Sequence, residues 1–176
     1  NDSDTYYSLS KFKDERILPA LIKTLPNLNG YALGSAKLLI IELNDQDKLP
    51  QLISLANDPN HKNKSETYNA ITQLKDARSI PFALELLITS PRLSDRHYAI
   101  DILQAFPQSA EAIKGLIDIL DFNFQSLAVG KEVVTNNNEL FKEKITKALN
   151  MMTKQSLKAN KEKWLEYYHN TYKIIK

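Results

Sequence analysis

Apolar residues recur along most of this chain at helical spacing, in a pattern that repeats about every 31 residues. The pattern is clearest at Leu18-Pro19-Ala20-Leu21-Ile22, which returns as Leu49-Pro50-Gln51-Leu52-Ile53 and as Ile80-Pro81-Phe82-Ala83-Leu84. A fourth copy, Ile113-Lys114-Gly115-Leu116-Ile117, keeps the apolar positions without the proline. Because proline lacks the backbone N–H that the first turn of a helix leaves unpaired, each copy predicts the start of a helix.

Each of these starts is followed by one apolar stripe, and then by a second stripe some twenty residues further on. The first stripes are Leu18/Leu21/Ile22/Leu25, Leu49/Leu52/Ile53/Ala56, Ile80/Ala83/Leu84/Leu87 and Ile113/Leu116/Ile117/Leu120. The second stripes are Ala36/Leu39/Ile40/Leu43, Ala70/Ile71/Leu74, Ala99/Ile102/Leu103/Phe106 and Ile145/Ala148/Leu149. The long apolar patterns have a period of about 3.6 and none alternates, which predicts an all-α protein of about nine or ten helices.

The repeated Leu-Pro or Ile-Pro pair and the apolar positions behind it resemble short HEAT repeats of the bilin-lyase type. The resemblance covers roughly residues 14–152. It implies an α–α superhelix of about four helical hairpins. Members of that superfamily are mostly scaffolds, with a few lyase-associated and DNA-repair relatives, so it implies a fold more firmly than an activity. The fourth copy departs from the pattern at Lys114 and in the longer distance to its second helix.

The expected organisation is one solenoid domain over residues 1–176, with an N-terminal cap over 1–13, repeats over 14–152 and a C-terminal capping helix over 153–176. The last segment places Trp164, Tyr168 and Tyr172 four residues apart. We interpret these aromatic residues as a buried cap against the fourth repeat, rather than as a binding platform. They also resemble the terminal element of many bacterial HEAT-like proteins.

Turn and cap residues predict where the helices break. Asn27 to Gly30 predicts a short turn, and Ser65 and Ser109 stand where a side chain accepts backbone N–H bonds at a helix start. Residues 121–138 form the least repetitive stretch, and we expect a loop in which Val133-Val134 offer apolar surface. Such an insertion is either tolerated decoration or a functional rim, and decoration is the interpretation we prefer.

Composition excludes several classes of chemistry. The chain of 176 residues has no cysteine, which removes thiolate chemistry, disulfides and cysteine metal sites. It has only four glycines and no apolar run of membrane-spanning length, so we expect a soluble protein. Its first residue is Asn1, which indicates that a leader or an expression boundary precedes it. A cytoplasmic and an exported location both stay open.

The titratable residues predict no active site. His61, His97 and His169 are too far apart in sequence to form a helical metal pair. His97 and Asp101 lie one helical turn apart, as a base and its orienting carboxylate could, but a solvated polar face is the preferred interpretation. We therefore expect no catalytic residue, no metal and no cofactor.

Charge is uneven, since residues 139–176 hold nine lysines and four glutamates. Lysine without arginine lacks the bidentate fork that favours phosphate recognition, so nucleic acid is a disfavoured partner. We expect a monomeric, non-catalytic scaffold that binds a protein or peptide along the outward residues of its second helices. Those candidate residues are Lys37, Asn69, Gln73, His97, Asp101 and Lys144. A DNA-binding or repair protein and a lyase-like enzyme remain the alternatives.

Overall fold

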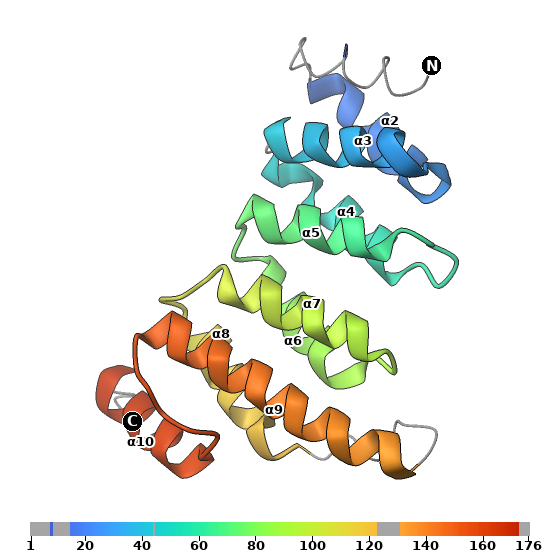
Figure 1. The fold of residues 1–176 in the computed structure, drawn as a ribbon. Coiled ribbons are helices and arrows are strands. Elements are labelled where there is room, and N and C mark those ends of the chain that lie inside the picture. Colours follow the sequence, from blue (N-terminus) through green and yellow to red (C-terminus); the bar gives the residue numbers. More distant parts are fainter. Residues whose placement is uncertain (1–7, 9–14, 44, 123–130, 173–176) are drawn as a thin grey trace. The chain divides into compact units, whose positions relative to one another are not determined.

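The computed structural model describes the chain at residue 8 and over residues 15–43, 45–122 and 131–172, with side chains omitted at 15, 46 and 131–137. These residues form nine α-helices and four short 3-10 helices, with no strand among them, which confirms the all-α prediction for this part of the chain (Figure 1). The α-helices are α2 Leu18–Thr24, α3 Gly30–Leu43, α4 Leu49–Asn57, α5 Lys64–Leu74, α6 Ser79–Thr89, α7 Leu93–Gln104, α8 Ala110–Asp118, α9 Lys131–Thr153 and α10 Lys161–Tyr172. The 3-10 helices are η1 Glu15–Ile17, η2 Leu25–Asn27, η3 Gln46–Lys48 and η4 Ile119–Asp121.

The helix starts follow the prolines as predicted. Pro19 and Pro50 lie in the first turns of α2 and α4, where a missing backbone N–H costs no intrahelical bond. The fourth copy uses a side chain instead, because the Ser109 hydroxyl accepts the backbone N–H of Ala112 at 3.2 Å. The predicted turn before α3 also holds, with Gly30 at a φ of +52°, a left-handed value that suits glycine.

The prediction for Ser65 is wrong. Helix α5 begins at Lys64, so Ser65 lies inside its first turn and bonds to the Glu66 carboxylate instead of capping the helix. Asn63 occupies the cap position, but its side-chain amide donates to two distant backbone carbonyls, those of Leu25 at 2.7 Å and Leu28 at 2.9 Å. The polar side chain at this helix start therefore connects two hairpins rather than closing one helix.

The predicted apolar stripes form the core. All four residues of the first stripe, from Leu18 to Leu25, are buried, as is the stripe from Ile113 to Leu120. The remaining predicted positions are buried except for four half-buried ones, which are Leu43, Ile53, Leu84 and Phe106. Period alone was therefore enough to identify which face of each helix is inside.

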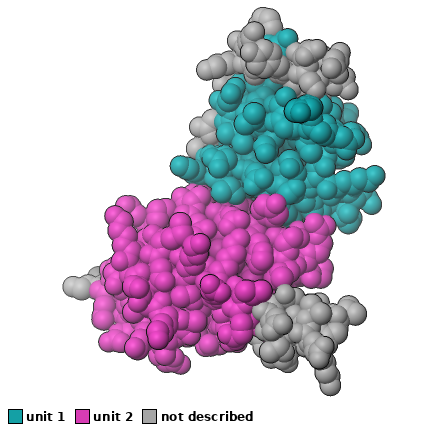
Figure 2. Space-filling view, in the orientation of Figure 1, with its two compact units in different colours: residues 1–79 teal, residues 80–176 magenta. Residues whose placement is uncertain are grey.

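The described residues belong to two compact units, which divide at the start of α6 (Figure 2). In the first unit, residues 1–79, α2 packs on α3 and α4, and both α3 and α4 pack on α5. In the second unit, residues 80–176, α7 packs on α8 and α9, while α8 packs on α9 and α10. Gly115 of α8 lies so close to Leu84 of α6 that a side chain at position 115 would collide with Leu84. Helices α6 and α8 therefore pack against each other at this glycine.

Helix α9 corrects the expectation for residues 121–138. We expected a loop, but residues 131–138 belong to one continuous helix that ends at Thr153. No proline or glycine follows Gly130 in this stretch, and each Val or Asn costs only a few tenths of a kcal/mol relative to a better helix former. A helix that already packs further along extends without a new nucleation cost. Residues 123–130 of the predicted loop, and the side chains of Val133 and Val134 for which we predicted apolar surface, lie outside the described residues.

Helix α10 carries two buried aromatic residues of the predicted C-terminal segment, Trp164 and Tyr168. Trp164 is fully buried, and its indole N–H donates to the Lys158 backbone carbonyl at 3.0 Å. The burial of Trp164 agrees with the prediction, and α10 packs on α8. The predicted N-terminal cap, residues 1–13, falls outside the described residues apart from residue 8.

Candidate interaction grooves on both sides of α9

The six candidate residues separate into two sets of three. The first unit holds Lys37 on α3 with Asn69 and Gln73 on α5, and these two helices pack together. The second unit holds His97 and Asp101 on α7 with Lys144 on α9, which also pack together. The structure leaves the role of the first set as a prediction, whereas it joins the residues of the second set by direct contacts.

Lys144 is the centre of the second set. Its ammonium lies 2.9 Å from the Asp101 carboxylate and donates to the backbone carbonyl of His97 at 3.1 Å. The ring of His97 stacks on buried Phe141, with centroids 5.8 Å apart and planes inclined by 14°. Lys144 and Phe141 of α9 are therefore both anchored on α7.

This geometry does not favour acid–base chemistry at His97. Burial lowers the pKa of the His97 imidazole, and the nearby Lys144 ammonium lowers that pKa further, against the opposing effect of Asp101. The Asp101 carboxylate, which would have to orient the imidazole of an acid–base pair, binds the Lys144 ammonium. The Lys144–Asp101 ion pair and the stacking of His97 on Phe141 thus hold α7 and α9 together.

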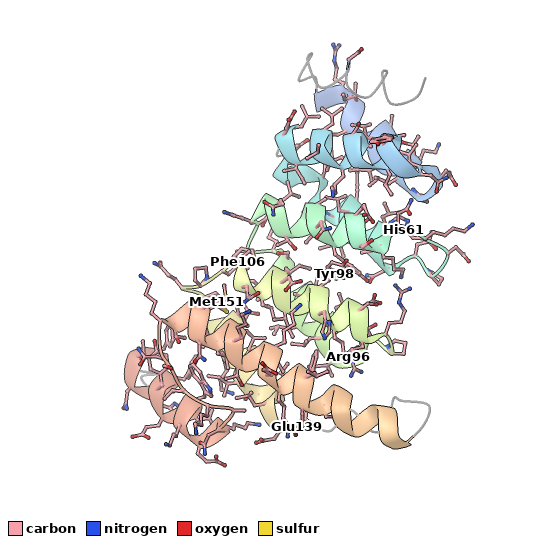
Figure 3. The ribbon with its side chains drawn as sticks, in the orientation of Figure 1. His61, Arg96, Tyr98, Phe106, Glu139 and Met151 are labelled. Carbon is pink, nitrogen blue, oxygen red and sulfur yellow. The ribbon has the colours of Figure 1, made fainter. Side chains whose placement is uncertain are left out.

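A groove of about 490 Å³ runs between α7 and α9 beside this contact. Its lining residues are Asp101, Gln104, Leu140, Glu143, Lys144, Lys147 and Met151. Leu140 and Met151 are 61% and 64% exposed, which is high for apolar side chains of this size. Figure 3 shows Met151 near the C-terminal end of α9 and Glu139 toward its N-terminal half. The groove therefore has an exposed apolar residue of α9 toward each end.

A second groove, of about 550 Å³, lies between α9 and the segment that leads to α10. Its lining residues are Glu139, Leu140, Lys142, Glu143, Thr146, Lys147, Asn150, Lys158 and Ala159. It shares Leu140, Glu143 and Lys147 with the first groove. These three residues form a ridge of α9 with a groove on each side, and we call them the α9 ridge.

Sequence reasoning missed the apolar part of this surface. Leu140 and Met151 lie outside the predicted stripe Ile145/Ala148/Leu149, and we predicted no role for either residue. Met152 is buried and Met151 is exposed. The available signal was the spacing of Leu140, Lys147 and Met151, which lie seven and four residues apart and so share one face of a helix.

His61, which we excluded only from a helical metal pair, makes a buried polar contact in the structure. It is 2% exposed, and its Nε2 lies 2.7 Å from the Thr67 hydroxyl of α5 (Figure 3). Burial lowers the pKa of His61, and the neighbouring Lys64 lowers it further, while Asp58 acts in the opposite direction. A buried neutral imidazole here serves to hold the α4–α5 loop on α5.

Among the described residues, no group of three or more His, Cys, Asp or Glu side chains is arranged to hold a metal ion. In the same part of the chain, no helix combines the length and the apolar character needed to cross a membrane.

Comparison of the chain with protein-family models, with curated proteins and with solved structures gives no match. The functional argument therefore depends on the chain's own residues and their geometry.

Proposed function

We propose that this protein is a non-catalytic interaction module, built as a short HEAT-like α-solenoid, that binds a protein or peptide partner in the groove between α7 and α9. The solenoid part of the proposal is supported by the regular recurrence of Leu-Pro and Ile-Pro at helix starts and by the helical hairpins within each unit. Repeats of this kind usually present surface for binding rather than an enclosed active site.

The observation that carries the proposal is the exposure of Leu140 and Met151 along one groove. A partner that removes apolar side chains of a groove from water stabilises the complex by about 25 cal/mol per Å² of apolar surface buried. Between them the groove offers an amide at Gln104 and charges at Glu143 and Lys147. An apolar surface with a polar rim is the usual composition of a protein interface.

A DNA-binding function, the first alternative, receives less support from the same surface. Two of its lysines are already paired, since Lys144 binds Asp101 and Lys142 lies 3.6 Å from Glu139. The buried Trp164 cannot stack on a base without leaving the core. Affinity for DNA derives largely from cations that neutralise phosphates, and pairing reduces their number here.

A lyase-like enzyme, the second alternative, would need a reactive group in a groove. The titratable residue beside the α7–α9 groove with a shifted pKa is His97, which stacks on Phe141 and has the Lys144 ammonium at its backbone carbonyl. These contacts give His97 a structural role, so binding is the function that the geometry supports best.

Selection from a random peptide library on the whole chain tests the proposal. We expect enriched peptides whose binding is lost in the double variant Leu140→Asp, Met151→Asp and retained in Tyr31→Asp. Tyr31 is the matched control because it is an apolar residue of the first unit that is 87% exposed. A selection that enriches no peptide, or only peptides that bind the double variant equally well, would contradict the proposal.

A further inference from the structure

The face of α9 that carries Leu140 and Lys147 of the ridge also carries Met151, and it has the length and periodicity of a helix-binding surface. Leu140, Lys147 and Met151 lie on one face of α9, and the two exposed apolar residues, Leu140 and Met151, are eleven positions apart. At about 1.5 Å per residue these two residues lie roughly 16 Å apart, which corresponds to about three helical turns. A partner helix of at least that length covers both residues at once.

The opposite wall of the groove supports a helical partner. It is made by Asp101 and Gln104 of α7, and the Gln104 amide lies 3.7 Å from the Met151 sulfur. Two packed helices leave a groove between their ridges into which a third helix fits. Amphipathic helices commonly bind such grooves through apolar residues spaced three and four apart.

The charges of the two grooves indicate which polar residues the partner carries. Lys142 and Lys144 have acidic partners on the protein itself, namely Glu139 and Asp101. Lys147 and Lys158 make no ion pair with another described residue. They line the second groove together, Lys147 on α9 and Lys158 on the segment after it.

We propose that the α9 ridge, together with the neighbouring Met151, binds an amphipathic helix whose apolar face covers Leu140 and Met151 and whose adjacent edge carries carboxylates toward Lys147 and Lys158. This inference depends on the proposed function and adds the chemical class of the partner. Glu143 is the one acid of the two grooves without an ion pair among the described residues, so the free cations outnumber the free acids. A complementary partner edge is therefore acidic.

The exposed apolar residues Leu140 and Met151 distinguish a helical partner from a polyanion. A nucleic acid or another polyanion gains from Lys147 and Lys158 but little from covering Leu140 and Met151. An amphipathic helix gains from both, because burial of the apolar residues supplies affinity and the lysines select the charge of its edge. Changes at Leu140 and Met151 should therefore reduce the affinity for the helix, whereas charge reversal at Lys147 and Lys158 should change which charge of peptide is preferred.

The test uses fluorescein-labelled helical peptides of about 16 residues, a length of ~24 Å as helix. One carries leucines on one face and glutamates on the adjacent edge, a second has lysines in place of the glutamates, and a third has serines in place of the leucines. Fluorescence anisotropy with the whole chain should show the acidic peptide binding about tenfold more tightly than the lysine peptide. The serine peptide should not bind measurably.

Charge reversal identifies the lysines. The double variant Lys147→Glu, Lys158→Glu should invert the preference between the acidic and the lysine peptide. The matched control Lys23→Glu, Lys62→Glu makes the same change in net charge at two exposed lysines of the first unit, and should leave the preference unchanged. Circular dichroism of each variant checks that its helix content is retained.

Three results would overturn this inference. The lysine peptide binds as well as the acidic one, or the preference survives in Lys147→Glu, Lys158→Glu, or a single-stranded oligonucleotide binds in a manner that Leu140→Asp, Met151→Asp does not affect. Library peptides that require Leu140 and Met151 but ignore both lysines would leave the proposed function standing and refute the acidic helix alone. An empty selection would instead refute the proposed function.

Discussion

The α4–α5 loop of the first unit and the exposed face of α9 in the second unit use their polar residues in opposite ways. In the loop, His61 bonds to Thr67, Asn63 bonds to two carbonyls of the preceding hairpin, and the Asp58 carboxylate accepts the backbone N–H of Asn60 at 2.8 Å. On α9, Glu143 and Lys147 of the ridge make no ion pair with another residue in the part of the chain that the structure describes, and exposed apolar side chains lie beside them.

This contrast shows how to separate residues that build the fold from residues that are available for binding. A buried polar group that loses its hydrogen bond costs about 1–3 kcal/mol, so the loop residues matter to stability. Exposed side chains such as Leu140 and Met151 contribute little to stability when changed. Residues that the fold does not need, grouped in a groove, are the ones to which we assign binding.

The largest effect should come from the core of the second unit, which sharpens the contrast with the ridge of the same unit. Trp164→Ala removes a fully buried indole and should lower the free energy of unfolding by about 3–5 kcal/mol. Denaturant unfolding measures this change. Tyr31→Ala, at an exposed aromatic residue, is the control and should change the value by less than about 0.5 kcal/mol. Equal effects of the two variants would show that the C-terminal cap assignment is wrong.

The second largest effect should come from the two hydrogen bonds by which Asn63 joins the α4–α5 loop to the preceding hairpin. Asn63→Ala removes two hydrogen bonds to backbone carbonyls, at about 0.5–1.5 kcal/mol each, and should destabilise by roughly 1–3 kcal/mol. Asn60→Ala, at an exposed residue of the same loop, should cost less than about 0.5 kcal/mol. Chemical denaturation compares the free energies of unfolding of the two variants. Similar losses would show that the hydrogen bonds of Asn63 do not contribute specifically to stability.

The next prediction concerns pH, and it extends the contrast to the buried histidine of the loop. Burial lowers the pKa of His61 in the folded state below its ordinary value of about 6.5, so the unfolded chain binds the proton more readily. The corresponding stability is fully present above that ordinary value and is lost as the pH falls below it. His97, whose pKa is also lowered by burial, contributes with the same sign.

Thermal unfolding between about pH 7.5 and 5 measures this dependence. The unfolding temperature should fall toward pH 5, and His61→Gln should flatten the slope. Asp76 does not interfere in this range, because its bond to Arg78 lowers its pKa below the ordinary acidic value. A slope that is the same with and without His61 would show that protonation of this residue does not oppose folding.

The smallest effect on stability should come from the exposed apolar residues of the α7–α9 groove. Leu140→Asp together with Met151→Asp changes two exposed residues and should alter the free energy of unfolding by less than about 0.5 kcal/mol each, while peptide binding is lost. Unfolding and anisotropy measurements on one protein preparation make the comparison. A loss of several kcal/mol would place these residues in the fold and remove the basis for the binding assignment.

The sequence predicted the helix starts and the core because both depend on local chemistry. Pro19 and Pro50 lie in the first turn of their helices, and the Ser109 hydroxyl accepts a backbone N–H from the first turn of the helix that it precedes. The buried stripes follow from helical period. The extension of α9 was missed, since Val and Asn have modest helix propensities that packing elsewhere in the same helix overrides.

Contacts between distant residues set the limit of that prediction. The hydrogen bonds of the Asn63 side chain were not predicted, because its partners Leu25 and Leu28 lie 38 and 35 residues earlier in the chain. The outward positions His97, Asp101 and Lys144 could be proposed from helical geometry, and the structure brings them into contact. The apolar component of the groove was missed, because exposure of Met151 next to buried Met152 depends on which helices pack against α9.

The most direct test of the binding assignment is a map of backbone amide chemical shifts during titration of the ¹⁵N-labelled chain with the acidic amphipathic peptide. We predict that the largest changes fall on the α7–α9 groove, at Gln104, Lys147 and Met151, and that they saturate together. Saturating changes at Asn69 and Gln73 of α5 without changes along α9 would place the binding surface in the first unit and contradict the account.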